Sequence, residues 1–212
     1  LNTEELKILL GFVNYLGLSA DVISVLVCYC RDRARQKGRR NPSLRSIEKE
    51  AYAWAERGID TMEEAAAYIL TRAVIKSSAK KYRAAVLDMN LYEELVGGVI
   101  NADFYYMREQ AELNCKMYQQ ALNDIETAID FAPDNLLYYI EKGMLCYRVK
   151  LTDEGVRTMQ KACELAPDVA DVHYLLGRLY MQQGNILQAK SALETADKLG
   201  HTEARVQLEN LK

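Results

Sequence analysis

A chain of 212 residues can hold one or two domains, and 50% of its residues are hydrophobic, which is enough to build a sizeable core. Only three prolines interrupt the sequence, which favours an all-helical protein. The 27 basic and 30 acidic side chains leave a formal net charge of −3, which excludes a bulk electrostatic attraction to nucleic acid. Only a local basic patch could supply such an attraction.

The sequence carries no pattern typical of an enzyme. It has no glycine-rich phosphate loop, no zinc-ligand cluster and no nucleophile turn, so we expect no catalytic residue, no metal and no cofactor. The five cysteines are odd in number and lack metal-ligand spacing, which indicates reduced thiols. We therefore expect a cytoplasmic protein. An upstream targeting segment stays an open alternative, because the chain begins at Leu1.

Two helices are predicted at the start of the chain. The first spans residues 3–17, with Thr3 as its N-cap. The second spans residues 19–36, is capped by Ser19 and is apolar almost all round. A helix with so little polar surface is usually the buried centre of a bundle.

Two further helices complete this bundle. The third spans residues 43–58 and buries Trp54 at helical spacing. The fourth spans residues 61–70, where Thr61 and Glu64 have the spacing of a capping box. Four helices around one tryptophan predict a small, self-contained helical bundle over residues 1–70.

The second helix ends in a strongly basic run, and only Asp32 opposes it. A basic helix end gains only about 0.3–1 kcal/mol per charge from the helix dipole, so six cations exceed what capping needs. Two interpretations stay open: a solvated loop, or contact with DNA phosphates, which would specify no base sequence. The candidate nucleic-acid residues are Arg31, Arg33, Arg35, Lys37, Arg39 and Arg40.

The bundle resembles the DnaD-like domain of bacterial and phage replication-initiation proteins, over about residues 4–70. The resemblance is carried by LSADVISVLVCYCRDRARQKGRRNPSLRSIEKEAYAWAERGIDTMEEAAAYI. The family's signature places Tyr, Ile and Trp four residues apart; here Trp54 is present, with Glu50 at the Ile position and Ser46 at the Tyr position. The resemblance implies a role in primosome assembly, with binding of DNA and of partner proteins.

The C-terminal part repeats at a spacing of 34 residues, which indicates helical units that stack on their neighbours. Three units over residues 102–203 resemble the tetratricopeptide repeat, a helix pair with a small residue at the helix crossing and a proline after the second helix. The first unit has Glu109 at the small position and Glu112 at the aromatic position. His173 falls at a packing position, so we expect it in the core. The recurring positions include Pro133 and Pro167, Gly143 and Gly177, and Ala128, Ala162 and Ala196.

Residues 71–101 are predicted to be a degenerate repeat or a junction. Tyr82, Ala85 and Asp88 match Tyr118, Ala121 and Asp124 at an offset of 36, and the first helix of such a unit should lie near 66–78. One helix would then serve both segments, or the junction is an engineered fusion or a chain break. Residues 204–212 are expected to form a C-terminal capping helix with Thr202 as its cap. The predicted fold is all-α: a small helical bundle followed by an α-solenoid of three to four tetratricopeptide-like helix pairs.

The resemblance to the tetratricopeptide repeat implies a groove lined by the first helix of each unit. Tyr, Met and Arg are enriched at interface cores, so a protein or peptide partner is expected there. The Lys and Asn clamp with which chaperone-binding members hold a terminal carboxylate is absent, which favours a more apolar or aromatic peptide. Repeat phase nominates Tyr106, Gln110, Asn114, Ile140, Met144, Tyr147, Arg148, Tyr174, Arg178, Met181 and Gln182.

Together these features predict a non-enzymatic adaptor. Its repeat groove would bind a protein or peptide, while the bundle would engage DNA or replication-initiation proteins. The competing prediction is a purely protein–protein scaffold that binds no nucleic acid. A third alternative is an enzyme whose catalytic domain lies outside this sequence.

Overall fold

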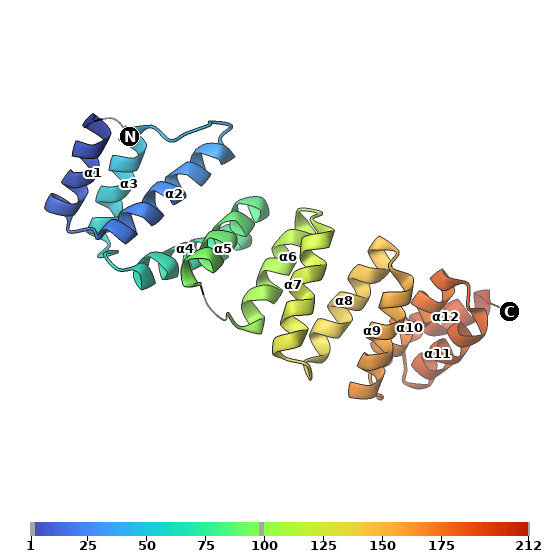
Figure 1. The fold of residues 1–212 in the computed structure, drawn as a ribbon. Helices are drawn as coiled ribbons and strands as arrows, with labels where there is room; N and C mark the ends of the chain where they lie inside the picture. The colour runs from blue at the N-terminus through green and yellow to red at the C-terminus, as the bar shows by residue number, and fades with distance from the viewer. Residues whose placement is uncertain (1–2, 98–99, 212) are drawn as a thin grey trace. The chain divides into compact units, whose positions relative to one another are not determined.

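The computed structural model describes residues 3–97 and 100–211, and each regular element in these residues is an α-helix (Figure 1). The all-α class predicted from the sequence is therefore confirmed. The first compact unit ends at Ile100, and the second starts at Asn101. The first unit holds α1 (Thr3–Leu16), α2 (Ala20–Gln36), α3 (Leu44–Glu56), α4 (Met62–Ser78) and α5 (Tyr82–Val96). The second holds α6 (Ala102–Asn114), α7 (Tyr118–Phe131), α8 (Leu136–Val149), α9 (Thr152–Leu165), α10 (Ala170–Gln183), α11 (Ile186–Lys198) and α12 (Thr202–Asn210).

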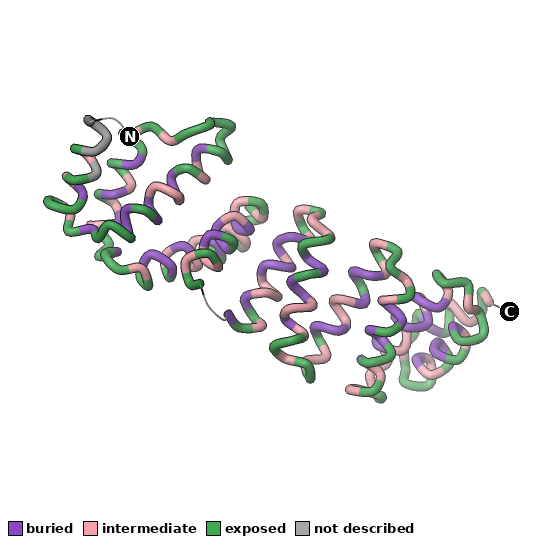
Figure 2. Tube along the Cα trace, in the orientation of Figure 1, coloured by how far each residue is buried: buried purple, intermediate pink, exposed green. Residues whose placement is uncertain are grey.

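The core of the first unit forms around Trp54 of α3, which is fully buried. Its ring centroid lies 5.6 Å from that of Tyr29 in α2 and 5.8 Å from that of Tyr68 in α4. Tilted aromatic pairs at such distances add to the free energy gained by burying their surface. Buried positions recur along α2 and α3 (Figure 2), as the predicted bundle requires.

Helix starts in the first unit follow the predicted capping residues. Ser19 Oγ accepts a hydrogen bond from the Val22 backbone N–H at 3.3 Å, and α2 begins directly after Ser19, at Ala20. Thr61 Oγ1 accepts from the Glu64 N–H at 3.2 Å, while Glu64 Oε2 accepts from the Thr61 N–H at 3.1 Å. These bonds satisfy backbone donors that have no partner within the helix. The predicted cap Thr3 lies outside the side chains that the structure describes.

Helix α4 belongs both to the bundle and to the helix pair that follows it. Its N-terminal half packs Ala65 and Ile69 into the core around the tryptophan. Further along, Arg72 forms an ion pair with Asp88 of α5. The prediction that the fourth helix ends at residue 70 is wrong, because no glycine or proline interrupts the helix over residues 62–78. The alternative in which one helix serves both segments matches the structure.

The turn between α4 and α5 has the same backbone geometry as the turns within the later pairs. In each turn the residue after the positive-φ position donates its N–H to the carbonyl five residues earlier, at 2.8–2.9 Å. The degenerate unit predicted from the 36-residue offset is therefore a fourth helix pair. The positive φ angles are 57° at Lys80, 60° at Lys116, 63° at Lys150 and 83° at Gly184.

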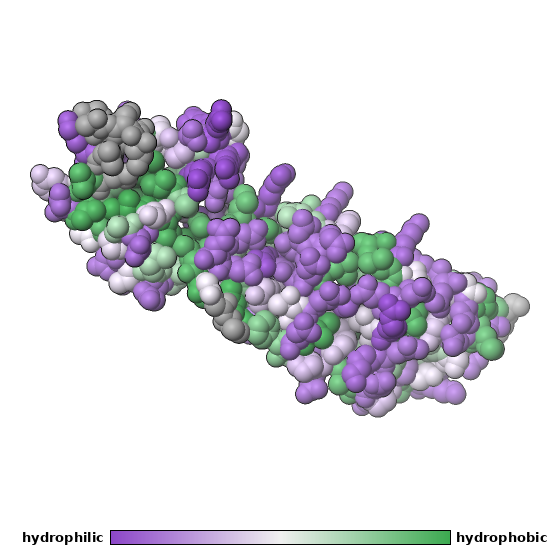
Figure 3. Space-filling view, in the orientation of Figure 1, coloured by the Kyte–Doolittle hydropathy of each residue, from purple (hydrophilic) through white to green (hydrophobic). Residues whose placement is uncertain are grey.

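The second unit is a solenoid in which each helix from α6 to α12 packs against the next, and α8 also contacts α10. Glycine is needed where the paired helices approach most closely. A Cβ at Gly177 would lie 2.7 Å from Leu193 Cγ, and one at Gly143 would overlap Met159 Sδ. The visible face of this unit is mostly hydrophilic (Figure 3).

Helix α12 packs onto the last helix pair, as predicted, but its cap differs from the prediction. Ala204 is fully buried against Leu193 and Ala196 of α11. Thr202 is the first helical residue rather than the cap. The N-cap is His201, whose Nδ1 accepts a hydrogen bond from the Ala204 N–H at 3.3 Å. Sequence reasoning missed this cap because histidine is not among the residues that usually cap helices.

Candidate functional site

The residues predicted to line the groove lie on α6, α8 and α10, the first helices of the three pairs. None of them is fully buried, so each offers some surface to a partner. Tyr106, Gln110, Ile140, Tyr147, Tyr174, Arg178 and Met181 are half-buried, whereas Asn114, Met144, Arg148 and Gln182 are exposed.

Five of these residues meet in one concavity of about 430 Å³, hereafter the Arg178 concavity. Its lining residues are Tyr147, Tyr174, Arg178, Met181, Gln182 and Gln207. Gln207 comes from α12 and was not predicted. Helix α12 lies outside the 34-residue repeats, so the sequence assigns none of its residues a position in the repeat. The position of α12 on the last helix pair brings it to this site.

A stack of planar groups forms one wall of the Arg178 concavity. The guanidinium carbon of Arg178 lies 4.3 Å from the ring centroid of Tyr147 and 5.8 Å from that of Tyr174. Tyr174 in turn stacks on His201, with 3.9 Å between ring centroids. Gln182 Nε2 donates to the Tyr147 carbonyl at 3.2 Å. These contacts hold the arginine over aromatic faces, where cation–π attraction is favourable.

The predicted residues on α6 lie outside this concavity and contact other residues of α6 and α8 instead. The Tyr106 ring centroid is 5.3 Å from that of Tyr138. Gln110 Nε2 donates to Glu109 Oε2 at 2.8 Å, and Asn114 Nδ2 donates to the Gln110 carbonyl at 2.8 Å. Ile140, Met144 and Arg148 on α8 also lie outside the set that lines the concavity.

Two glutamates of α6 are buried where the other repeats have small or apolar residues. Glu109 is 0% exposed and Glu112 is 3% exposed. Burial raises the pKa of Glu109 to about 8, reinforced by the charge of Glu141. Burial likewise raises the pKa of Glu112 to about 8, reinforced by Asp124. One carboxyl oxygen of each glutamate, Glu109 Oε1 and Glu112 Oε2, has no hydrogen-bond partner.

An Arg–Asp ion pair recurs at the 36-residue offset, partly buried between α4 and α5 and buried between α6 and α7. In α4–α5, Arg72 Nε donates to Asp88 Oδ2 at 2.7 Å. In α6–α7, Arg108 Nε donates to Asp124 Oδ2 at 2.6 Å, and Arg108 Nη2 donates to Asp124 Oδ1 at 2.8 Å. The aspartates were matched in the sequence, but their arginine partners were not. The sequence does contain a signal for the arginines, because the arginine and the aspartate of the pair both recur at the same offset of 36 residues.

The basic run at the end of α2 contributes three residues to a pocket of about 260 Å³. Among its lining residues are Arg33, Lys37 and Arg39 from the run and Ser43, Ser46 and Lys49 from the start of α3. Arg31, Arg35 and Arg40 do not line it. Arg31 Nη2 donates to Cys28 Sγ at 3.1 Å, and Arg35 pairs with Asp32 at 3.7 Å.

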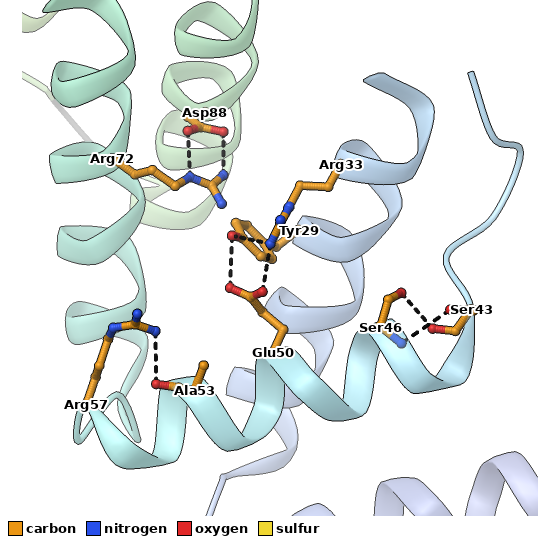
Figure 4. A network of polar contacts seen from close by, with 9 residues as sticks. All are labelled: Tyr29, Arg33, Ser43, Ser46, Glu50, Ala53, Arg57, Arg72 and Asp88. Carbon is orange, nitrogen blue, oxygen red and sulfur yellow. Dashed lines mark hydrogen bonds and ion pairs between the residues drawn. The ribbon is translucent and has the colours of Figure 1, made fainter. Parts of the chain in front are cut away.

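Glu50 holds one side of this pocket in place. Its Oε2 lies 2.7 Å from Arg33 Nη1, and its Oε1 accepts from the Tyr29 hydroxyl at 3.0 Å. Figure 4 shows Glu50 of α3 reaching both of these residues of α2. The carboxylate at the family's Ile position therefore ties α3 to α2, while Ser46 is exposed and Trp54 is buried.

A second basic concavity of about 460 Å³ lies in the same unit, lined by residues of α2, α3 and α4. It shares Arg33, Lys49 and Glu50 with the first pocket and adds Arg57 and Lys76 among others. Burial lowers the pKa of Lys76; Asp88 opposes this effect and Arg72 reinforces it. Arg33, Arg72 and Lys76 of this lining are paired with Glu50 and Asp88, so the excess of positive charge at this surface comes from Lys49 and Arg57.

His173 is half-buried rather than in the core, which corrects the sequence expectation. Its Nε2 lies 2.8 Å from the Pro167 carbonyl, so Nε2 carries the proton, and its Nδ1 faces Cys163 Sγ at 3.6 Å. Burial raises the pKa of the Cys163 thiol to about 11, so the thiol is not activated. Among the described residues, no group of three His, Cys, Asp or Glu side chains could hold a metal ion.

Two families match parts of this chain, one within each unit, and each match covers less than half of the chain. Residues 1–69 match the family of replication initiation and membrane attachment, and residues 150–211 match the tetratricopeptide repeat family. Both resemblances predicted from the sequence are confirmed. No curated protein matches the chain.

Solved structures confirm the fold of the repeats. YrrB, described as a tetratricopeptide protein with an unusual peptide-binding site, has 18% identity and a TM-score of 0.62, covering 73% of this chain and 83% of its own. MamA of Desulfovibrio magneticus RS-1 has 20% identity and a TM-score of 0.57, covering 82% and 93%. Identities this low establish the likeness of fold only.

No single helix within the described residues is long and apolar enough to cross a membrane. One pair, Leu10–Leu16 and Ala20–Gln36, meets the length and composition criteria together but bends by 120°.

Proposed function

We propose that this chain is a non-enzymatic adaptor that binds a peptide segment of a partner protein on the α8, α10 and α12 surface of its second unit. The Arg178 concavity carries the proposal, because five residues nominated by repeat phase line it. Its two tyrosines and its arginine belong to the residue types that contribute most at protein interfaces. The peptide-binding site described for YrrB, which shares this fold, supports the proposal.

The contacts around the concavity favour binding over a purely structural role. Tyr147 and Tyr174 are already held against Arg178, so a peptide would find an ordered surface. An ordered surface lowers the conformational entropy lost on association. Met181 adds a polarizable apolar wall, and such side chains adapt to different ligands.

Replacing both Tyr147 and Tyr174 by alanine should weaken peptide binding strongly, since both aromatic faces that hold Arg178 are removed. Hot-spot aromatic residues cost about 2 kcal/mol or more when truncated, which corresponds to a loss of affinity of roughly 30-fold or more. Peptides selected from a random library on the wild-type chain would be titrated against both proteins by fluorescence anisotropy.

The control is Leu187→Ala, which removes a side chain that is 82% exposed on α11 and lies outside the concavity. This variant should bind the selected peptides as the wild type does. Retention of affinity by the double tyrosine variant, or failure of the wild-type chain to select any peptide, would count against the proposal.

A second activity, nucleic-acid binding by the first unit, is favoured by its two adjoining basic concavities and by its match to the replication-initiation family. Lys37 and Arg39 are exposed and line the smaller one, so they are free to contact phosphates. Arg33 is less available because Glu50 already pairs with it. Such binding would be independent of base sequence and sensitive to salt.

Replacing Lys37 and Arg39 with glutamine should flatten the salt dependence of DNA affinity. The slope of log K against log salt should fall by about 2, roughly 1 for each phosphate that is no longer neutralised. Fluorescence anisotropy of a labelled duplex over a salt series measures this slope. Arg83→Gln, at an exposed position of α5, is the matched control and should leave it unchanged. A wild-type chain that binds no DNA at low salt would support the purely protein–protein scaffold instead.

A further inference from the structure

The pocket of about 260 Å³ at the end of α2 and the start of α3, hereafter the α2–α3 pocket, holds more positive charge than its own residues neutralise. Glu50 is the one carboxylate among its lining residues, and it already pairs with Arg33. Lys37, Arg39 and Lys49 also line the pocket, and none of them forms an ion pair within the residues that the structure describes. The α2–α3 pocket therefore keeps three uncompensated positive charges.

The start of α3 adds hydrogen-bond donors to the same pocket. Ser43 Oγ accepts a hydrogen bond from the Ser46 N–H at 3.3 Å, which leaves the proton of the Ser43 hydroxyl free to be donated. Figure 4 shows both serines at the N-terminal end of α3. The first N–H groups of a helix have no partner within the helix and carry partial positive charge. Cations together with neutral donors suit an anion that has several oxygens.

The charge of the α2–α3 pocket favours a phosphate monoester over the phosphodiester of a DNA backbone. Each phosphodiester of a strand carries one negative charge. A phosphate monoester carries about −1.5 to −2 at neutral pH and presents three acceptor oxygens. Three cations and a helix N-terminus match the monoester better. The volume of the pocket has room for a phosphate group and a few water molecules, so a strand can enter it only with its end.

The adjoining concavity of about 460 Å³ indicates that the ligand continues beyond this phosphate. The two hollows share Arg33, Lys49 and Glu50, so their linings are continuous. Lys49 and Arg57 lie eight residues apart on α3, about 12 Å along the helix axis. Successive phosphates of a B-DNA strand are about 3.4 Å apart along its axis, so several would pass between these two cations. A free nucleotide or one phosphorylated side chain would leave the larger concavity empty.

We infer that the α2–α3 pocket binds the 5′-terminal phosphate of a DNA strand, with Lys37, Arg39 and Lys49 neutralising its charge and the start of α3 donating hydrogen bonds to its oxygens. The inference rests on the proposed nucleic-acid activity of the first unit and directs that activity to strand ends. The 5′ end is the end of a DNA strand that normally carries a phosphate. The phosphates that follow it lie along Lys49 and Arg57.

The test compares short single DNA strands of one sequence that compete with an internally labelled strand for the full chain, followed by fluorescence anisotropy. The strand with a 5′-phosphate should bind at least about tenfold more tightly than the strand with a 5′-hydroxyl, since hydrogen bonds to charged groups are the strong ones. The isomer with its phosphate on the 3′ end has the same charge and should bind as the hydroxyl strand does. A nucleoside 5′-monophosphate, which lacks the strand, should compete far more weakly.

Variants assign the preference to the α2–α3 pocket. Replacing both Lys37 and Arg39 by glutamine should remove the preference for the 5′-phosphate. The matched control is Arg40→Gln, which removes an exposed cation beside Arg39 that does not line the pocket, and it should keep the preference. The amide NMR signals of Ser43 and Ser46 should shift with the phosphorylated strand and much less with the hydroxyl strand.

Three outcomes would contradict the inference in different ways. Equal affinity for the phosphorylated and hydroxyl strands, or a gain shared by the 3′ isomer, would overturn it, and DNA binding by the first unit would stand. Competition by the nucleoside monophosphate as strong as that by the phosphorylated strand would overturn the assignment to a strand end. A wild-type chain that binds no strand at low salt would overturn both the inference and the nucleic-acid activity.

Discussion

Glu109→Gln should stabilise the second unit, and the gain should increase as the pH rises from 5 to 8. Glu109 is fully buried in α6, and one of its carboxyl oxygens has no hydrogen-bond partner. Burial raises its pKa from 4.5 to about 8. Glutamine has nearly the same shape, carries no ionisable group and keeps an oxygen to accept the hydrogen bond from Gln110.

The sign of this effect follows from proton linkage. The folded state keeps the proton on Glu109 up to about pH 8, whereas the unfolded chain releases it near pH 4.5. Between these values the folded state binds more protons, so the free energy of unfolding falls as the pH rises, by roughly 1.4 kcal/mol per pH unit for one such group. Below the unfolded pKa the penalty vanishes. The gain from Glu109→Gln should therefore reach a few kcal/mol at pH 8 and be small at pH 4.5.

Urea denaturation at pH 5, 6.5 and 8, followed by circular dichroism, measures this difference between variant and wild type. Hydrogen exchange of the α6 and α7 amides assigns the effect to the second unit. Glu112→Gln should act in the same direction, because burial raises its pKa to about 8 as well. Glu194→Gln, at an exposed position of α11, should leave the pH dependence unchanged. Parallel pH profiles for Glu109→Gln and the wild type would contradict the prediction.

Asp124→Asn should destabilise the second unit by about 3–5 kcal/mol, because it removes the carboxylate that pairs with the buried guanidinium of Arg108. Both side chains of this pair are only 9% exposed, and their closest atoms lie 2.6 Å apart. Asparagine keeps the shape of the residue, so the change removes the charge and preserves the packing. Its oxygen can accept only weaker, neutral hydrogen bonds from the guanidinium.

Substitutions of two other aspartates serve as comparisons for Asp124→Asn. Asp130→Asn, at an exposed position of the same helix, should have little effect on the denaturation midpoint. Asp88→Asn removes the equivalent carboxylate from α5, which pairs with Arg72 and Lys76, and should destabilise the first unit instead. Guanidinium denaturation followed by hydrogen exchange would locate each loss. Equal midpoints for Asp124→Asn and Asp130→Asn would show that the buried pair contributes no net stability.

Local patterns were sufficient to predict most helices and several of their caps. Ser19, Thr61 and Glu64 were identified from composition and spacing, because capping bonds span only three residues. The extent of α4 was not predictable in this way. Ala65 and Ile69 pack in the bundle core and Arg72 pairs with Asp88 of α5, so the bundle and the next helix pair of the first unit share one uninterrupted helix.

The candidate site, like α4, was only partly predictable from the sequence. The 34-residue period placed Tyr147, Tyr174 and Arg178 on the first helices of their pairs, since a fixed period keeps each residue at the same phase of its helix. It could not show which of the eleven candidates share a concavity. That outcome depends on the packing of α12, which brings Gln207 to the site, and on His201 stacking against Tyr174.

The sequence by itself determined that the chain is all-α, that its second part is a tetratricopeptide solenoid and which helix faces bear the candidate residues. These properties depend on periodicity and on glycines such as Gly177, where a side chain would collide with Leu193. Only the tertiary structure decided which charges are paired. Arg33 and Arg108 are matched by carboxylates from other helices, whereas Arg178 lies against the ring of Tyr147. Ion pairing depends on distances of a few ångströms between side chains far apart in sequence, which no linear pattern specifies.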